Sequence, residues 1–337
     1  MAFKSKIIII AEAGLNHNGK YSLARKLVKA AAASGCDFIK FQTFKTEALL
    51  APKTPLAPYQ KKMHSSTACQ NSMLKRLALN YVDFKKIKTL CFQERIGFLS
   101  TAFDSESLSF IETLQPAFHK ISSGDINNYP FLRQVAKYQR PVILSTGMAT
   151  IQEVRLAVQT LREAGLALKK IVILQCHSDY PTQPKDVNLN VLKTYQTIFK
   201  TKVGLSDHSF GIYAPLAAVA LGAVVIEKHI TLSRKMKGPD HAASLEPEEL
   251  KNMVTGVRMV EESMGSGVKK PSPREKGVRV VARKSIFAKT SITAGEILSG
   301  KNMIIQRPAT GLSPAHWHRC LGKKARKNFI AGEPIRT

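Results

Sequence analysis

The chain has 337 residues, 44% of them hydrophobic, with 20 glycines and 16 prolines, which are ordinary numbers for a folded protein. This composition excludes a disordered or collagen-like chain, and the longest internal apolar run, residues 214–226, is too short to cross a bilayer. The formal net charge of +27 leaves nucleic acid, anionic small substrates or a basic proteome background open as explanations.

Apolar runs of strand length alternate with amphipathic runs of helix length through residues 6–264. Strands are expected at residues 6–12, 36–42, 97–101, 118–122, 141–145, 170–176, 202–206 and 223–229. Helices are expected at residues 21–34, 82–94, 105–114, 129–138, 151–164, 187–199, 213–221 and 245–264. Eight strands, each followed by a helix, predict an α/β protein with a (β/α)8 TIM barrel; an open doubly wound sheet is the alternative.

Two parts of the chain interrupt or follow this alternation. Residues 43–80 are proline-rich and are expected to form a long loop with one short helix. Residues 265–277 are rich in Gly and Pro and are expected to be a linker. Short β-like runs then predict a small mostly-β domain, at residues 279–288, 296–297 and 303–306. The expected division is a catalytic barrel of residues 1–264, the linker, and a domain of residues 278–337.

Two of the expected strands end in polar clusters that contain histidines, His208 and His229. Parallel strands bring such clusters to one rim, where two imidazoles can bind a divalent metal beside a substrate. The alternative is two unrelated histidines, each hydrogen-bonded to a backbone carbonyl. A closed barrel pairs the eighth strand with the first, which brings Glu12 near His229 and Glu227 and favours the metal.

Other polar side chains are expected at the same rim. Glu12 ends the first strand on its inward face, as a general acid–base, an ion-pair partner of Lys40, or both. Lys40 and Lys120 lie at strand ends and suit a phosphate or carboxylate anion. Hydroxyl groups at other strand ends can complete this anion site or can cap the helices that follow: Thr101, Ser123, Ser145 and Ser206.

Weaker signals come from the remaining rim residues. His17, His177 and His241 suit hydrogen-bonded scaffold or sugar contacts better than metal ligation. Asp240 follows the eighth strand and suits a sugar hydroxyl or a metal-bound water. Asp125 follows the fourth strand and could belong to a turn as easily as to the site.

The strand-end motifs form an ordered set through the whole barrel: A-E-A-G-L-N-H-N-G, F-I-K-F-Q, K-I-S-S-G-D-I-N-N-Y-P, L-S-T-G-M, Q-C-H-S-D-Y-P, G-L-S-D-H-S, E-K-H-I-T and K-G-P-D-H-A-A-S-L-E-P. This set resembles the sialic acid (N-acetylneuraminate) synthases, which condense phosphoenolpyruvate with an N-acylated aldohexose. The later run R-P-A-T-G-L-S-P resembles the antifreeze-like (SAF) domain of that family. The resemblance implies a TIM barrel followed by a small mostly-β antifreeze-like domain.

The resemblance also implies roles. His208 and His229 match ligands of a divalent metal, Mn²⁺ or Mg²⁺, that polarises the sugar aldehyde. Glu12 is expected to transfer protons, with Lys40 and Lys120 as the other catalytic residues. The positions expected to bind phosphoenolpyruvate are Lys40, Thr101, Lys120, Ser123, Ser145 and Ser206. Sugar contacts are expected from Gln42, Ser178, Tyr180 and Asp240.

Arg307 matches an arginine that the small domain sends into the partner subunit's barrel to bind the N-acyl group, which implies a domain-swapped homodimer. The implied reaction joins C3 of phosphoenolpyruvate to the aldehyde carbon, adds water at C2 and releases phosphate, giving a nonulosonic (sialic) acid. His177-Ser178-Asp179 departs from the usual family residues after Cys176. Leu15-Asn16 fits the neuraminate or legionaminate branch better than the pseudaminate branch.

Three other functions remain open. The first is a legionaminate or pseudaminate synthase that uses a 2,4-diacetamido-6-deoxy hexose. The second is a related enzyme with a phosphorylated sugar, which gives no reason for the small domain. The third is a nucleic-acid- or polysaccharide-binding protein, since residues 268–337 hold 16 Lys and Arg against 3 Glu. Aromatic and basic residues do not interleave there, so nucleic acid is not the expected partner.

The expected location is the cytoplasm. The five cysteines have no Cys-x-x-Cys spacing, and their odd number predicts reduced thiols. Glu12 also interrupts the early apolar run that would otherwise imitate a signal peptide, and no association with a membrane is expected.

Overall fold

The computed structural model describes residues 6–56 and 69–336, and the chain forms two compact units, Met1–Gly265 and Ser266–Thr337. Part of the long loop expected after the second strand, including Pro58, lies outside the described residues. No helix in the described part of the chain is long and apolar enough to cross a membrane.

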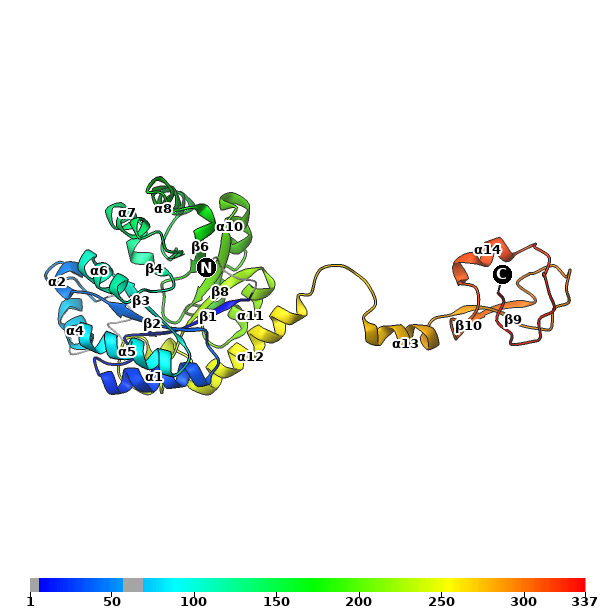
Figure 1. The fold of residues 1–337 in the computed structure, drawn as a ribbon, viewed down its shortest axis with the longest axis horizontal. Coiled ribbons are helices and arrows are strands. Elements are labelled where there is room, and N and C mark those ends of the chain that lie inside the picture. Colours follow the sequence, from blue (N-terminus) through cyan, green and yellow to red (C-terminus); the bar gives the residue numbers. More distant parts are fainter. Residues whose placement is uncertain (1–5, 57–68, 337) are drawn as a thin grey trace. The chain divides into compact units, whose positions relative to one another are not determined.

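The first unit is a closed barrel of parallel strands in sequential order (Figure 1). Its strands are β1 (Ile8–Gly14), β2 (Phe38–Thr43), β3 (Gly97–Ala102), β4 (His119–Ile121), β5 (Val142–Ser145), β6 (Ile171–Cys176), β7 (Lys202–Asp207) and β8 (Ala223–His229). β8 pairs with β1, with Glu12 opposite His229. This closure confirms the predicted TIM barrel and excludes the open sheet.

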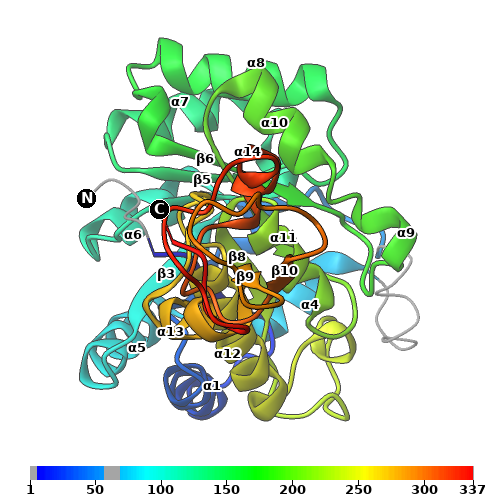
Figure 2. The same ribbon diagram turned by 90° about the vertical axis from the view of Figure 1, so that its right-hand side faces the viewer.

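Helices cover the outside of the barrel (Figures 1 and 2). The long ones are α1 (Tyr21–Ala33), α5 (Tyr81–Gln93), α6 (Ser105–Thr113), α7 (Tyr129–Lys137), α8 (Ile151–Glu163), α10 (Val191–Phe199), α11 (Tyr213–Ala220) and α12 (Pro247–Ser263). Shorter ones are α2 (Thr46–Leu49), α4 (Gln70–Leu77) and α9 (Pro184–Val187). Side-chain caps define several starts, as at Thr150, whose hydroxyl accepts the Glu153 amide in a capping box.

The prediction of one helix over residues 187–199 is wrong for its first four residues, because two helices lie here. α9 ends at Val187 because Asn188 adopts the left-handed conformation, with φ of 48°, and α10 begins only at Val191. Two short helices, α2 and α4, lie in the described part of the long loop, where one was expected.

An apolar plug fills the lower part of the barrel. It consists of inward-facing residues of the strands and the chain beside them: Ile10, Leu99, Phe118, Ile143, Val172, Leu174 and Val225. A second, larger core lies between the strands and the helices. Because the plug occupies the interior below the strand ends, the polar side chains of the barrel interior gather at the carboxyl-terminal mouth.

The second unit contains α13 (Pro273–Ala282), the antiparallel pair β9 (Ser285–Ala288) and β10 (Met303–Gln306), and the short helix α14 (Trp317–Cys320). Isolated bridges join its later segments, and its core includes Ile286, Ile292, Met303, Phe329 and Ile335.

Two expectations are wrong at helix α13. The helix begins inside residues 265–277, which were expected to be a linker, and it includes residues 279–282, which were expected to be strand. The cause is a capping box: Ser272 Oγ accepts the Glu275 amide at 3.2 Å, and Glu275 Oε2 accepts the Ser272 amide at 2.7 Å. Pro273 at the first helical position adds to this start signal.

Candidate active site

A cavity of about 330 Å³ opens at the carboxyl ends of the strands. Every strand contributes to its wall, since its lining includes Glu12, Lys40, Thr101, Lys120, Ser145, Cys176, Ser206, Glu227 and His229. Gln42, Ser123, Ser178, Tyr180 and His208 also line it. The structure therefore brings all but two of the predicted site residues, Asp240 and Arg307, to one cavity.

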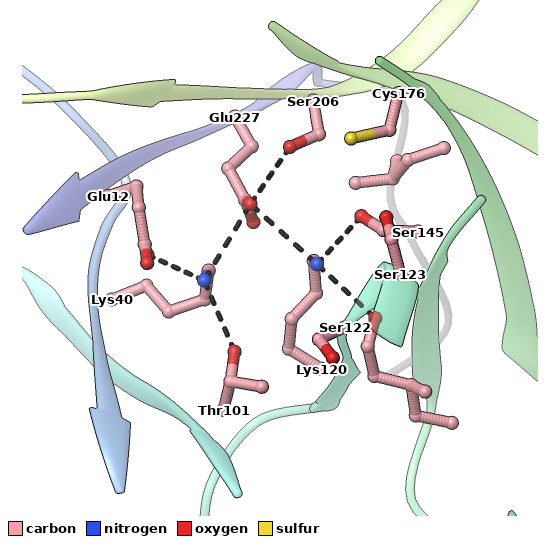
Figure 3. A network of polar contacts seen from close by, with 12 residues as sticks. Glu12, Lys40, Thr101, Lys120, Ser122, Ser123, Ser145, Cys176, Ser206 and Glu227 are labelled. Atoms are coloured by element: carbon pink, nitrogen blue, oxygen red, sulfur yellow. Dashed lines mark hydrogen bonds and ion pairs between the residues drawn. The ribbon is translucent and has the colours of Figure 1, made fainter. Parts of the chain in front are cut away.

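Two lysines form the charged centre of this cavity (Figure 3). Lys40 Nζ lies 2.6 Å from Glu12 Oε2 and donates to Thr101 Oγ1 at 3.2 Å. Lys120 Nζ donates to Ser145 Oγ at 2.8 Å. Because these charged side chains are at most 5% exposed, their interactions are only weakly screened by solvent.

Glu227 connects the two lysines (Figure 3). Its Oε1 lies 3.6 Å from Lys40 Nζ and 3.7 Å from Lys120 Nζ, and it accepts from Ser206 Oγ at 3.1 Å. Its Oε2 is buried without a hydrogen-bond partner among the described residues. Glu227 was expected only as a neighbour of Glu12, although the period of two along β8 already puts its side chain on the same face as that of His229.

The two carboxyl groups titrate differently. Burial raises the pKa of Glu12 to about 7; the nearby charge of Glu227 adds to this rise and Lys40 opposes it. Burial also acts to raise the pKa of Glu227, but Lys120 and Lys40 outweigh it and leave that pKa below its ordinary value. Glu12 is therefore the group whose protonation can change near neutral pH.

The four hydroxyls face the cavity and do not cap the following helices. Thr101, Ser145 and Ser206 make the lysine and carboxylate contacts given above, and Ser123 Oγ accepts the Gly147 amide at 2.9 Å. The side-chain caps of α6, α7 and α8 are instead Asp104, Asn128 and Thr150. Gly147 matters here because an added Cβ would lie 2.3 Å from Ser178 Oγ.

His208 and His229 face the same cavity, with ring centroids 5.4 Å apart. His208 Nδ1 lies 2.5 Å from the His177 carbonyl oxygen, which can only accept, so Nδ1 carries the hydrogen. In the neutral tautomer this leaves the lone pair on His208 Nε2, which lies 3.0 Å from the Tyr180 hydroxyl oxygen. This arrangement orients the ring as metal-binding histidines are commonly oriented.

The donor atoms at these histidines fit a divalent metal. His229 Nδ1 is buried and has no hydrogen-bond partner among the described residues, and burial lowers the pKa of His229 well below its ordinary value. A neutral imidazole is the form that binds a metal. No group of three or more His, Cys, Asp or Glu arranged to hold a metal is present in residues 6–56 and 69–336.

Gly14 lies where three of these groups converge. Its φ is +48°, and a Cβ at this position would lie 3.2 Å from His229 Cε1 and 3.3 Å from both Asp240 Oδ2 and Glu12 Oε1. Asp240 thus reaches the site from the loop after β8, and burial raises its pKa to about 6. Gln42 Nε2 donates to Glu12 Oε1 at 3.2 Å.

The remaining candidates lie elsewhere. Arg307 belongs to the second unit, and its expected role stays a prediction. His241 Nδ1 lies 2.7 Å from Thr231 Oγ1 and its Nε2 3.3 Å from Asn18 Oδ1, in the scaffold that joins the loops after β1 and β8. Besides Glu227, five lining residues were not among the predicted site residues: Phe103, Ser122, Gly124, Met148 and Cys176.

Comparisons with known proteins identify the family. A profile of the NeuB family matches residues 27–269, and one of the SAF domain matches residues 283–337. The chain is 44% identical to an N,N′-diacetyllegionaminic acid synthase of Campylobacter jejuni, over 98% of this chain and 99% of the relative. It is 42% identical to an enzyme of the same name from Legionella pneumophila, over 97% and 92%.

Among solved structures, the N-acetylneuraminic acid (sialic acid) synthetase of Leptospira borgpetersenii, crystallised with citrate, is 32% identical to this chain. The two structures align with a TM-score of 0.71 over 81% of this chain and 90% of that one. The family profile covers most of the barrel and the relatives span nearly the whole sequence, so the chain belongs to the NeuB family of acid synthases and carries a SAF domain after its barrel.

Proposed function

We propose that the protein condenses phosphoenolpyruvate with an N-acylated aldohexose and water to give a nonulosonic acid and phosphate. The observation that carries this proposal is the single cavity in which Lys40 and Lys120 face His208 and His229. One half of the cavity suits a phosphorylated anion and the other suits a polarised aldehyde, which are the two reactants of such a condensation.

The lysine half would bind phosphoenolpyruvate. Two buried ammonium groups can hold the phosphate and carboxylate, and the hydroxyls of Thr101, Ser123 and Ser145 can donate further hydrogen bonds. Glu227 stays ionised between the lysines, so it fixes their positions and balances part of their charge before the substrate arrives.

The histidine half would bind Mn²⁺ or Mg²⁺ through His208 and His229, with the remaining positions left for water or substrate. A divalent metal there supplies Lewis-acid polarisation of the sugar aldehyde. Tyr180, Gln42 and Asp240 lie at this side and would hold the sugar hydroxyls.

Glu12 accounts for one of the two proton transfers. The electron pair at C3 of phosphoenolpyruvate forms the new bond to the aldehyde carbon, and the aldehyde oxygen becomes a hydroxyl by taking a proton from the medium. Water adds to the resulting cation at C2 and gives one proton to Glu12. The C2–O bond to phosphate then breaks as the remaining C2 hydroxyl becomes the carbonyl, and the proton that this hydroxyl loses replaces the one taken up by the aldehyde oxygen. Glu12 returns its proton to the departing phosphate. A pKa of about 7 suits Glu12 both to take up this proton and to return it.

The comparisons favour a 2,4-diacetamido-6-deoxy hexose as the sugar over N-acetylmannosamine. The relatives that are 44% and 42% identical are both named N,N′-diacetyllegionaminic acid synthases, whereas the sialic acid synthetase structure is 32% identical. The residues Leu15-Asn16 agree with this branch and disfavour the pseudaminate branch.

The test is phosphate release by the full chain with phosphoenolpyruvate, Mn²⁺ and each sugar separately, with the product identified by mass. We expect release only when all three components are present, fastest with the 2,4-diacetamido-6-deoxy mannose-type sugar. Faster turnover with N-acetylmannosamine would overturn the sugar assignment, and turnover that persists in EDTA would overturn the metal. Release without any sugar would contradict the condensation itself.

A further inference from the structure

A buried ion pair immediately precedes the two imidazoles of the active site. Lys228 Nζ lies 2.5 Å from Asp207 Oδ2, and the two side chains are 0% and 1% exposed. Asp207 and Lys228 are register partners where β7 pairs with β8. His208 and His229 are the next residues in each chain segment.

The pair lies outside the cavity. Ser206 of β7 and His208, the residue directly after β7, line the cavity, as do Glu227 and His229 of β8. Because successive side chains of a strand point to opposite faces, Asp207 and Lys228 point outward, toward the helical layer. The pair therefore does not contact the substrates, although it is covalently next to both imidazoles.

The pair also fixes the chain just after β7. Asp207 Oδ1 accepts from the Ser209 amide at 3.0 Å and from Ser209 Oγ at 2.7 Å. Lys228 Nζ donates to the Ser209 carbonyl oxygen. Both backbone polar groups of Ser209 are thus bound by the pair, so the residue that follows His208 is tied to the residue that precedes His229.

His208 is constrained from its other side as well. Its carbonyl oxygen accepts the Thr182 amide at 2.9 Å, and its Nδ1 donates to the His177 carbonyl at 2.5 Å. The backbone ladder between β7 and β8 ends at the Asp207–Lys228 partners, one residue before the two histidines. With the His208 ring oriented by His177 and its backbone held by Ser209, the ion pair is the side-chain link that joins the two strands at this end.

We infer that Lys228 and Asp207 are positioning residues that set the spacing of His208 and His229 for a divalent metal; this inference rests on the metal site of the proposed function. A contribution to stability does not by itself explain why a buried ion pair is present here. Desolvating two charges offsets much of their attraction, and replacing a buried pair by neutral residues of similar volume is often neutral or stabilising. A positioning role and a stabilising role therefore predict different results.

The experiment uses the full chain with Lys228→Met/Asp207→Leu and measures Mn²⁺ affinity without substrates, by the electron paramagnetic resonance signal of free Mn²⁺, beside thermal unfolding. We expect a folded protein whose Kd for Mn²⁺ rises roughly 10- to 100-fold, the usual effect of changing residues that orient metal ligands. The matched control is Arg140→Met/Glu112→Gln, an ion pair outside the cavity, which should leave the Kd unchanged.

An unchanged Kd in the folded double variant would overturn the inference. If that variant does not fold, Lys228→Met/Asp207→Asn replaces it, because Asn keeps an acceptor for Ser209; an unchanged Kd there has the same consequence. His208→Ala and His229→Ala distinguish a wrong metal site from a wrong positioning role. Mn²⁺ affinity that neither histidine affects would overturn the metal site and the positioning role together, whereas affinity lost in these variants but kept in both double variants would overturn positioning alone.

Discussion

Glu12 and Glu227 share one cavity, but their neighbours shift their pKa values in opposite directions. Glu227 lies between two ammonium groups and stays ionised, whereas Glu12 contacts one lysine and is dominated by burial. Pairs of carboxyl groups whose pKa values are separated in this way are a common basis for assigning a fixed charge and a proton carrier.

Replacing Glu12 by Gln tests the proton carrier. The amide keeps the shape of the side chain but cannot accept the proton of the attacking water, so kcat should fall roughly 10²- to 10⁴-fold. Binding of phosphoenolpyruvate, measured by titration calorimetry, should persist because Lys40 and Lys120 remain. Glu227→Gln is the comparison: it should weaken that binding, since the lysines lose their shared partner. Near-normal kcat in Glu12→Gln would exclude the assigned role.

Gly14→Ala tests the crowding at the metal side. The left-handed backbone costs about 1 kcal/mol for a residue with a Cβ, and the new methyl group would press on His229, Asp240 and Glu12. We expect a loss of turnover far larger than this modest loss of stability. Gly265→Ala is the matched control, because Gly265 has a φ of +56° and nothing within 4 Å of its added Cβ. Equal effects of the two substitutions on turnover would show that strain alone is responsible.

A polar residue at the end of a strand could be placed in the cavity from the sequence alone when the period of two put its side chain on the inward face. Glu12, Lys40 and His229 follow from this rule. The bridging position of Glu227 between Lys40 and Lys120 could not be read in the same way, because it depends on strands that are distant in the sequence and on side-chain lengths. Tyr180 was placed by its motif, but its stacking on His208 at 4.0 Å depends on the fold of the loop after β6.

Among elements, the loops after β1 and β8 are joined by buried polar contacts that make them sensitive to acid. Asn16 Nδ2 donates to the Ile230 carbonyl and to Ser244 Oγ, and His241 contacts Asn18. Burial lowers the pKa of both His17 and His241 to about 4. The His241 ring thus takes part in the contact between the two loops in its neutral form.

The expected consequence is a loss of stability below neutral pH. An unfolded histidine binds a proton near pH 6.5, whereas these folded rings bind one only near pH 4. The unfolded chain therefore takes up more protons between these values, and the free energy of unfolding falls as pH decreases through that window. At pH 5 each ring should contribute on the order of 2 kcal/mol to this loss.

Urea unfolding at pH 7.5 and pH 5 measures this effect. His241→Gln should reduce the difference between the two pH values, whereas the same change at the exposed His318 of the second unit should not. A free energy of unfolding that is equal at both pH values would contradict the neutral state of the two rings.

At the same scale, the barrel elements were predictable because each strand and helix has its own apolar period and cap. The break between α9 and α10 was not, since only the left-handed Asn188 separates two segments with a continuous apolar pattern. Helix α13 was missed although Ser272 and Glu275 carry a capping signature; the surrounding glycines, prolines and charges outweighed it in the interpretation.

For the whole molecule, the homodimer implied by Arg307 has a sharp test. In a domain-swapped dimer each site combines one subunit's barrel with the partner's small domain. Arg307→Ala and Lys120→Ala should each be inactive alone. When the two are mixed and allowed to exchange subunits, one site of each mixed dimer has an intact barrel and an intact arginine, so activity should return.

Size-exclusion chromatography of the mixture, with phosphate release as the assay, checks this result. A mixture of two barrel variants, Lys40→Ala and Lys120→Ala, is the control that should stay inactive, because no site in it has an intact barrel. Mixed dimers of Arg307→Ala and Lys120→Ala that remain inactive would show that Arg307 does not serve the partner's barrel.

The pairing of β1 with β8 has a consequence for how the protein folds during its synthesis. Residue 12 meets residue 229 only when the last strand docks, so a nascent chain on the ribosome carries an open sheet edge for most of its synthesis. The lysine side of the cavity comes from β2 to β5, whereas His208 follows β7 and His229 ends β8, so the two sides of the cavity meet only after the last strand has docked. The barrel's part of the reaction centre is therefore completed in one step, by the docking of β8 against β1.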